Sequence, residues 1–495
     1  MITSYRRTLF AILALSLVGG CAAGPDFKTP AAPEAPSYTH HALTTTSATP
    51  GIAGGEAQRF STGDIPADWW TLFHSKPLNA LIEQALAHNP DLKAAQAALT
   101  VARENTLAQH GASVPHLSAG IAVSREQDPP GSLAPVPSTN AFLYNLFTPQ
   151  LSISYAPDIF GLNRRTTESA AAQEQAVRYQ MIAAHITLSS NVAVAAIQDA
   201  ALEAQVDATR QLVDINKKML GILQYQLGKG YASGVDLAAQ QAQFASTEAS
   251  LPPLLKQLSQ QRNLLSVLSG RLPNQASPEI FELSSLTLPQ DLPVSLPSVL
   301  VRQRPDVLQA EANMRSANAQ VGVATANRLP NITLTANAGS TALEIGQIFG
   351  PGTGFWNIGA GLLAPIFDGG TLLHQQRGAR AAYLQTAEQY RSTVLTAFQN
   401  VADTLVALEQ DADGLKASAA AADAAKTSLD LSQLQYKDGY VGYLNVLSAE
   451  QAYQQARIAL VQAQASRFSD TAALFQALGG GWWHRADLTS GDHAQ

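Results

Sequence analysis

The feature that most restricts the fold is an internal repeat in the layout of prolines, glycines and apolar residues. In the first half of the chain the step from Pro90 to Pro115 is 25 residues, and in the second half the step from Pro305 to Pro330 is the same. Two further pairs of segments match in the same order: YAPDIFG (155–161) with LAPIFDG (363–369), and LGKGYASGVDLAAQQAQF (227–244) with YKDGYVGYLNVLSAEQAY (436–453). Self-similarity of this length indicates a duplicated structural unit.

Within each unit the hydrophobic period changes from helical to alternating. A helix is expected from Pro90 to Val114, because proline is tolerated in a first turn and Pro115 ends the segment. Apolar residues then occupy every second position from Leu117 to Val123, which is typical of a half-buried strand. The same alternation recurs and predicts four strands in all, at about 116–127 and 147–157 in the first unit and about 331–341 and 354–365 in the second.

After each pair of strands the period is helical again over a long stretch. Residues 163–227 contain no proline, and at 1.5 Å per residue a helix of about 65 residues is about 100 Å long. The second unit repeats this from 371 to 436. Glycine-rich turns follow both helices, and helices are expected to return to about Ser269 and Leu478, the first of them disturbed at Pro252 and Pro253.

Four strands of about ten residues, apolar on one face, have the length and alternation of strands that span a membrane. Four strands cannot close into a barrel by themselves. In hydrocarbon an open sheet edge leaves backbone N–H and C=O groups unpaired, at a cost of several kcal/mol each, so several chains must complete one barrel. A dimer would give eight strands with a filled lumen, whereas a trimer gives twelve and leaves room for passage. The residues therefore predict a fold that is mainly α with a membrane β part, in which several chains with four strands each complete one barrel and the helices pack side by side into a tube below it. The alternative is a non-channel periplasmic scaffold whose hairpins lie on the helices.

The N-terminus predicts export and lipid attachment. Arg6 and Arg7 precede an apolar run too short to span a bilayer, so residues 1–20 are expected to be a signal peptide. The small residues before Cys21 resemble a bacterial lipobox, in which the cysteine is acylated; the alternative is a chance free cysteine after an ordinary signal peptide. Ala22, in place of aspartate, favours the outer membrane. Residues 21–62, rich in proline, are expected to be a lipidated, extended tether with no core of its own.

Composition argues against several classes of function. The net charge is −7 and only 14% of residues are charged, so there is no basic surface with which to bind nucleic acid. The motifs HExxH, CxxC and GxSxG do not occur, and ten histidines are scattered without ligand spacing. No catalytic residue, metal site or cofactor is therefore expected.

Four segments, CAAGPDFKTP, DWWTLFHSKPLNALIEQALAHNPDLKAA, RPDVLQAEANMRSANAQVGVA and PIFDGG, occur in the order found in a known family. On these segments the chain resembles the TolC-like outer-membrane efflux family, in particular its NodT/OprM-type RND efflux lipoproteins. The resemblance implies a homotrimer that is lipid-anchored in the cell outer membrane. Its fold would be a trimeric 12-stranded β-barrel, four strands per chain, continued in the periplasm by a long α-helical barrel. It also implies docking, through a periplasmic adaptor (membrane fusion protein), to an inner-membrane RND pump that supplies the energy. It places Trp69 and Trp70 in packing rather than in a membrane interface.

The expected function is therefore a passive exit duct for small molecules or drugs, and not an enzyme. A type I protein-secretion duct of the same fold is the alternative in this class. The two efflux repeats are expected at 63–282 and 283–480, with a C-terminal tail at 481–495.

The resemblance also implies which residues form the periplasmic mouth, which would lie at the turns 228–234 and 437–443. Asp236 matches an acidic position of the family and Tyr436 a gate tyrosine; for both, a solvated helix cap is the alternative. Asn445 occupies a place where relatives often carry a carboxylate. Gly230 and Gly439 are explained by sharp backbone turns.

Asp438 is a candidate for adaptor contact or for pairing at the gate. A solvated turn is the simpler interpretation of this residue.

Overall fold

The computed structural model describes residues 22–41, 43–129, 131, 141–275 and 281–489, so the expected signal peptide and Cys21 lie outside the described residues. The described chain divides into two compact units. The first contains Leu99–Val177 and Ala310–Tyr390 together with residues 22–30; the second contains the described parts of Ala31–Ala98, Arg178–Gln309 and Arg391–Gln495. Each unit therefore takes stretches from both repeats.

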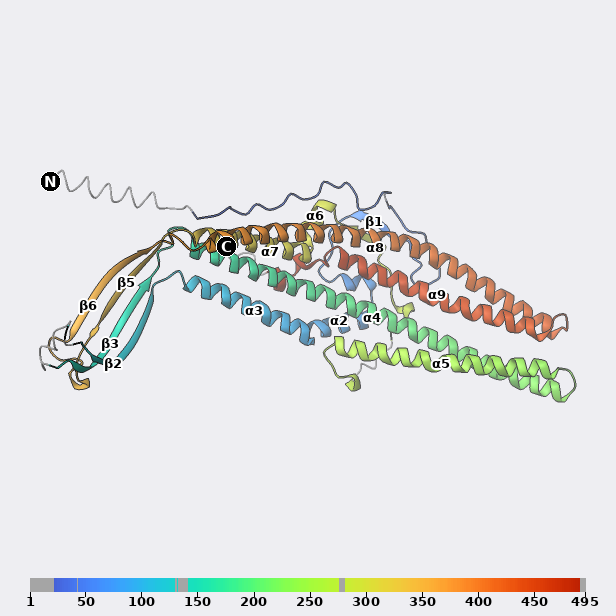
Figure 1. Cartoon of the computed structure of the whole chain (residues 1–495). Helices are drawn as coiled ribbons and strands as arrows, with labels where there is room; N and C mark the ends of the chain where they lie inside the picture. The colour runs from blue at the N-terminus through green and yellow to red at the C-terminus, as the bar shows by residue number, and fades with distance from the viewer. Residues whose placement is uncertain (1–21, 42, 130, 132–140, 276–280, 490–495) are drawn as a thin grey trace. The chain divides into compact units, whose positions relative to one another are not determined.

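The first unit holds an antiparallel sheet of four strands in the order β2-β3-β5-β6 (Figure 1). The strands are β2 (His116–Gln127), β3 (Leu143–Tyr155), β5 (Asn331–Ser340) and β6 (Gly354–Leu363). All four lie where the alternation predicts them, although β3 begins earlier than expected. The reason is its pairing with β2, which continues until Gln127 faces Leu143.

The sheet has an apolar face that this chain leaves open. On β2, Leu117, Ile121 and Val123 are 69%, 61% and 63% exposed, and on β6 the side chains of Ile358 and Leu362 are equally open. The register places Leu117 opposite Ile153 of β3, so the apolar positions of neighbouring strands share one face. Among the described residues β2 and β6 are the edges of this sheet.

The two repeats build helices of equal length, which confirms the duplicated unit. Helices α3 (Pro90–Gly111) and α7 (Pro305–Ala326) have 22 residues each, α4 (Leu162–Gly228) and α8 (Thr371–Lys437) have 67 each, and α5 (Gly234–Leu268) and α9 (Tyr443–Ala477) have 35 each. The bounds agree with the prediction to within about one turn. Of the described helices, α4 alone is long and apolar enough to cross a membrane, but 67% of its most apolar stretch is buried in the protein.

Helix α5 continues through Pro252 and Pro253, where the sequence predicts a disturbance. Each proline removes one N–H donor from the helix. Both prolines are exposed, so water can solvate the carbonyl groups that lose their donors. The helix therefore tolerates the pair without ending.

Shorter elements complete the chain: β1 (Arg59–Thr62), η1 (Trp69–Phe73), α2 (Lys76–His88), η2 (Pro273–Gln275), η3 (Leu283–Ser285), β4 (Asp291–Val294), α6 (Pro297–Gln303), η4 (Ile345–Gln347), η5 (Trp482–His484) and α10 (Ala486–Thr489). In the second unit β1 pairs in parallel with β4. Trp69 and Trp70 are buried, and the Trp69 ring stacks on Phe475 with centroids 5.3 Å apart. The expectation that these tryptophans pack is confirmed.

The described residues of the segment 22–62, expected to be a tether without a core, have little regular structure but are docked on the helices. In the first unit the Ala23 N–H donates to the Phe160 carbonyl at 2.9 Å, and Asp26 pairs with Arg165 at 2.7 Å. In the second unit Gln58 is fully buried, and its Nε2 donates to Thr471 Oγ1 at 3.1 Å. The segment differs from a free tether, because hydrogen bonds to the helices and to the residues before α4 hold it in place.

Candidate functional site at the helical turns

The turns between α4 and α5 and between α8 and α9 have the same backbone design. Gly230 and Gly439 adopt φ values of 80° and 78°, a left-handed conformation that residues with a Cβ rarely adopt. In each turn the residue after the glycine donates its N–H to a carbonyl five residues back, Tyr231 to Gln226 and Tyr440 to Gln435, both at 2.9 Å. This pairing ends both helices as a Schellman motif does, as expected from the glycines.

In the first turn, Asp236 closes a capping box at the start of α5. The Ser233 Oγ accepts the Asp236 N–H at 3.1 Å, and the Asp236 carboxylate accepts the Ser233 N–H at 3.2 Å and its hydroxyl at 2.7 Å. A carboxylate in the first turn is also favoured by the helix dipole. The alternative interpretation of Asp236, a helix cap, thus describes its observed contacts.

The second turn lacks a side-chain cap. Its N-cap is Gly442, and Asn445 takes the position in α9 that Asp236 has in α5, donating its N–H to the Gly442 carbonyl at 3.0 Å. Asn445 and Asp438 are both exposed. Both side chains are therefore accessible to a partner at this end of the hairpin.

Among the predicted site residues, Tyr436 connects the two helical hairpins, which are formed by α4 with α5 and by α8 with α9. Its hydroxyl donates to Gln226 Oε1 on α4 at 3.1 Å, and its ring meets the edge of the Tyr443 ring with centroids 5.4 Å apart. Burial, together with the nearby Asp236 carboxylate, raises the pKa of the Tyr436 phenol. Tyr436 therefore stays neutral and acts as a hydrogen-bond donor between α8 and α4.

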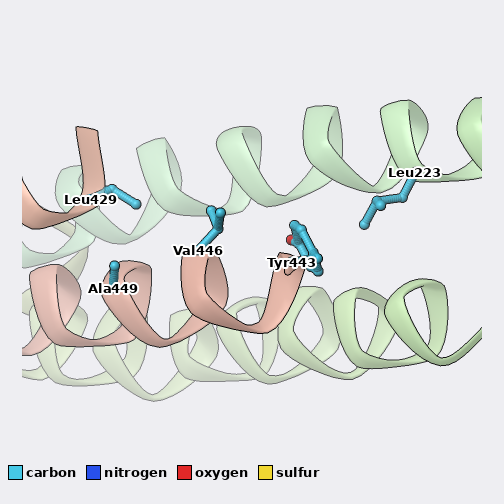
Figure 2. Packing of buried hydrophobic residues seen from close by; sticks show 5 residues of the cluster. All are labelled: Leu223, Leu429, Tyr443, Val446 and Ala449. Carbon is cyan, nitrogen blue, oxygen red and sulfur yellow. The ribbon is translucent and has the colours of Figure 1, made fainter. Parts of the chain in front are cut away.

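An apolar cluster packs the hairpins together beside these turns. It contains Leu223 of α4, Leu429 of α8, and Tyr443, Val446 and Ala449 of α9. Figure 2 shows the three α9 side chains in a row, facing the other two helices. Contacts of this kind hold helices together in proportion to the apolar area that they bury.

A set of buried polar side chains lies next to this cluster, and sequence reasoning missed it. Asn216 of α4, Gln240 of α5, and Tyr443 and Glu450 of α9 are at most 3% exposed. Burial raises the pKa of Glu450 to about 7. The sequence signal was present, since Glu450 stands on the same helical face as Tyr443, Val446 and Ala449.

In the described part of the chain no group of three or more histidine, cysteine or acidic side chains is arranged to hold a metal ion. The site consists of helix ends, hydrogen bonds and apolar contacts. These contacts hold the helices together when they are formed, and the helices can separate when they are broken.

Comparison with known proteins identifies the family. The sequence pattern of the family described as Outer membrane efflux protein matches residues 81–271 and 296–480, one stretch in each repeat. The pyoverdine export outer membrane protein OpmQ of Pseudomonas aeruginosa is 31% identical over 431 residues, which cover 86% of this chain and 90% of that one. Outer membrane protein OprJ of the same species is 29% identical over 492 residues, which cover 96% and 97%.

Solved structures agree with the sequence comparison. The open state of the MtrE outer membrane channel of Neisseria gonorrhoeae superposes with a TM-score of 0.78 at 27% identity, covering 93% of this chain and 99% of that one. The chain therefore belongs to the outer membrane efflux protein family, as the outer-membrane channel component of an efflux system.

Proposed function

We propose that three copies of the chain form a passive exit duct for small molecules or drugs, coupled through a periplasmic adaptor to an inner-membrane RND pump. The observation that carries the proposal is the four-stranded sheet with its open apolar face and its two edge strands, β2 and β6. In hydrocarbon each unpaired backbone group costs several kcal/mol, so both edges need partners. Pairing β2 of one copy with β6 of the next supplies them, and twelve strands leave an open lumen.

The helices are proposed to continue the duct through the periplasm. The equal lengths of α4 and α8, and of α5 and α9, support a tube in which the repeats alternate around a common axis. A continuous helix of 67 residues is about 100 Å long. The duct itself is proposed to carry out no chemistry, because the pump supplies the energy.

The two helical turns are proposed to form the periplasmic mouth. Asp236, Tyr436, Asp438 and Asn445 would surround it, with Gly230 and Gly439 setting the turns. Support comes from the Tyr436 hydroxyl, which bonds one hairpin to the other. Opening of the mouth would require this contact to loosen.

Cys21 is proposed to carry acyl chains that anchor the mature N-terminus in the outer membrane. Several acyl chains on one residue give stable anchoring, since each buried methylene contributes about 0.8 kcal/mol. The docking of Ala23 and Asp26 on α4 and the segment before it supports an anchor held close to the protein body. The proposed order along the chain is signal peptide, N-terminal segment to residue 62, repeats at 63–282 and 283–480, and tail.

Purified full-length protein in a planar lipid bilayer tests the proposal. Discrete conductance steps, together with a detergent complex whose protein mass is that of three chains, are the expected result. A monomer without conductance would contradict the duct and would support a non-channel periplasmic scaffold.

A further inference from the structure

Four buried polar side chains, Asn216, Gln240, Tyr443 and Glu450, form what we term the polar clasp. They are 1%, 0%, 2% and 3% exposed, respectively. Side chains of these types are rarely buried so fully unless they are paired. The polar clasp joins α4 and α5 to α9, and it shares Tyr443 with the apolar cluster of Figure 2.

Hydrogen bonds run through the polar clasp from one end to the other. The Tyr443 hydroxyl donates to Gln240 Oε1, and Gln240 Nε2 donates to Asn216 Oδ1 at 2.9 Å. Asn216 Nδ2 then donates to Glu450 Oε1 at 3.1 Å. The bonds begin and end on α9, so the hairpin of α4 and α5 holds α9 at two points that lie two helical turns apart.

Glu450 is the acidic member of the polar clasp, and its surroundings favour the neutral form. Among the described residues, the charged or titratable groups that interact with Tyr443 are Glu450, Tyr436 on α8 and Asp236 on α5. On α4 beside Asn216, the side chains of Asp214, Lys217 and Lys218 are exposed. Burial raises the Glu450 pKa from its ordinary 4.5 to about 7, and no cation in the described part of the chain lowers it again. A buried carboxylate without a paired cation is strongly unfavourable.

We propose that Glu450 is a proton-sensitive positioning residue for opening of the mouth. Protonated, it accepts the Asn216 amide and keeps α9 against the hairpin of α4 and α5. Ionised, it favours a state in which the helices part and water reaches the carboxylate. The inference rests on the proposed function, because it concerns the opening of a duct.

The direction of the pH effect follows from proton binding. The parted state binds fewer protons than the packed state at any pH between the two pKa values of Glu450, 4.5 when hydrated and about 7 when buried. The open probability of the mouth is therefore expected to increase as the pH rises from about 5 to about 7, and to level off above that range. The increase is at most about tenfold per pH unit for each chain.

The test measures open probability of the full-length protein in planar bilayers between pH 5 and 8. Wild type is expected to open more as the pH rises to about 7, whereas Glu450→Gln, which is neutral at every pH, is expected to stay at the low-pH level. Asp411→Asn is the matched control. Asp411 on α8 also has a pKa raised to about 7, by burial and by Asp470, but it lies outside the polar clasp.

If Glu450→Gln does not assemble, Asn216→Ser is the second variant, because it leaves the Glu450 carboxyl group in place. Asn216→Ser removes the bond to Glu450 and is expected to raise open probability at pH 5. A pH response in Glu450→Gln equal to that of wild type, or a flat response in wild type, overturns the inference and leaves the duct intact. Absence of any conductance in wild type overturns the duct as well.

Discussion

Individual side chains at the turns divide into those that join helices and those that cap them. Tyr436 joins α8 to α4 through its hydroxyl, whereas the Asp236 carboxylate is occupied by Ser233 of its own turn. Both residues resemble gate positions in sequence, but they have different local partners. A residue that forms a hydrogen bond between helices can directly affect opening of the proposed periplasmic mouth. A capping residue acts mainly on the stability of its own helix.

Replacing Tyr436 with phenylalanine is expected to ease opening. The substitution removes the hydrogen bond to Gln226, which contributes about 0.5–1.5 kcal/mol, so open probability is expected to rise about 2–10-fold. Single-channel recording at fixed pH measures the change. Tyr440→Phe is the control, because Tyr440 is 82% exposed in the turn itself. Equal effects of the two substitutions would show that the bond to Gln226 does not restrain the mouth.

Arg467 is expected to be a main stabilising residue of the second unit. It is 1% exposed, and its guanidinium donates to the carbonyls of Leu408 at 2.8 Å and Glu56 at 3.2 Å. Arg467→Met leaves these two carbonyl groups without their donor, at a cost of about 1–3 kcal/mol each, so we expect a loss of about 2–6 kcal/mol in the free energy of unfolding. Circular dichroism during thermal unfolding measures the loss.

The matched control for Arg467 is Arg59→Met. Arg59 forms an exposed ion pair with Asp291 at 2.8 Å, and such pairs contribute less than about 1 kcal/mol. A similar loss of stability in both variants would contradict the role given to the buried guanidinium.

At the scale of helices and strands, most of the fold could be predicted because the determining physics is local. Pro90 and Pro305 begin helices of 22 residues, and alternation marks the four strands of the sheet. The polar clasp could not be predicted in the same way. Burial of Glu450 depends on which face of α9 meets α4 and α5, and the contacts lie more than 200 residues apart in sequence. The docking of residues 22–62 is non-local for the same reason.

Substitutions at two glycines, one in a turn and one inside a helix, are expected to have opposite effects on stability. Gly439→Ala places a Cβ on a left-handed residue, and we expect it to cost about 1–2 kcal/mol of unfolding free energy. Gly414 lies exposed inside α8, and Gly414→Ala is expected to stabilise the protein by about 0.5–1 kcal/mol. Among the described residues neither added Cβ meets an atom within 4 Å, so backbone conformation alone sets the sign. Thermal unfolding that shifts in the same direction for both variants would contradict this account.

At the scale of the whole molecule, one chain provides a sheet that is incomplete in a membrane. The sequence predicts this incompleteness from the number of strands, since four cannot close a wall. The structure adds the identity of the two edges, β2 and β6, and the exposed apolar side chains that they carry. With one β2 edge and one β6 edge per chain, a closed ring of identical copies pairs β2 of each chain with β6 of its neighbour.

Cysteine cross-linking between chains in the outer membrane tests most directly whether the sheets of three copies close into one β-barrel. One cysteine is placed on β2 at Ser118, and a second is moved along β6 from 355 to 362, with oxidation followed by denaturing electrophoresis. A barrel closed by three copies predicts that a cysteine at some position on β6 forms a disulfide with the cysteine on β2 of a neighbouring chain, and that the largest cross-linked species contains three chains. Linked species that extend beyond three, or chains that stay single at every position, would contradict a barrel closed by three copies.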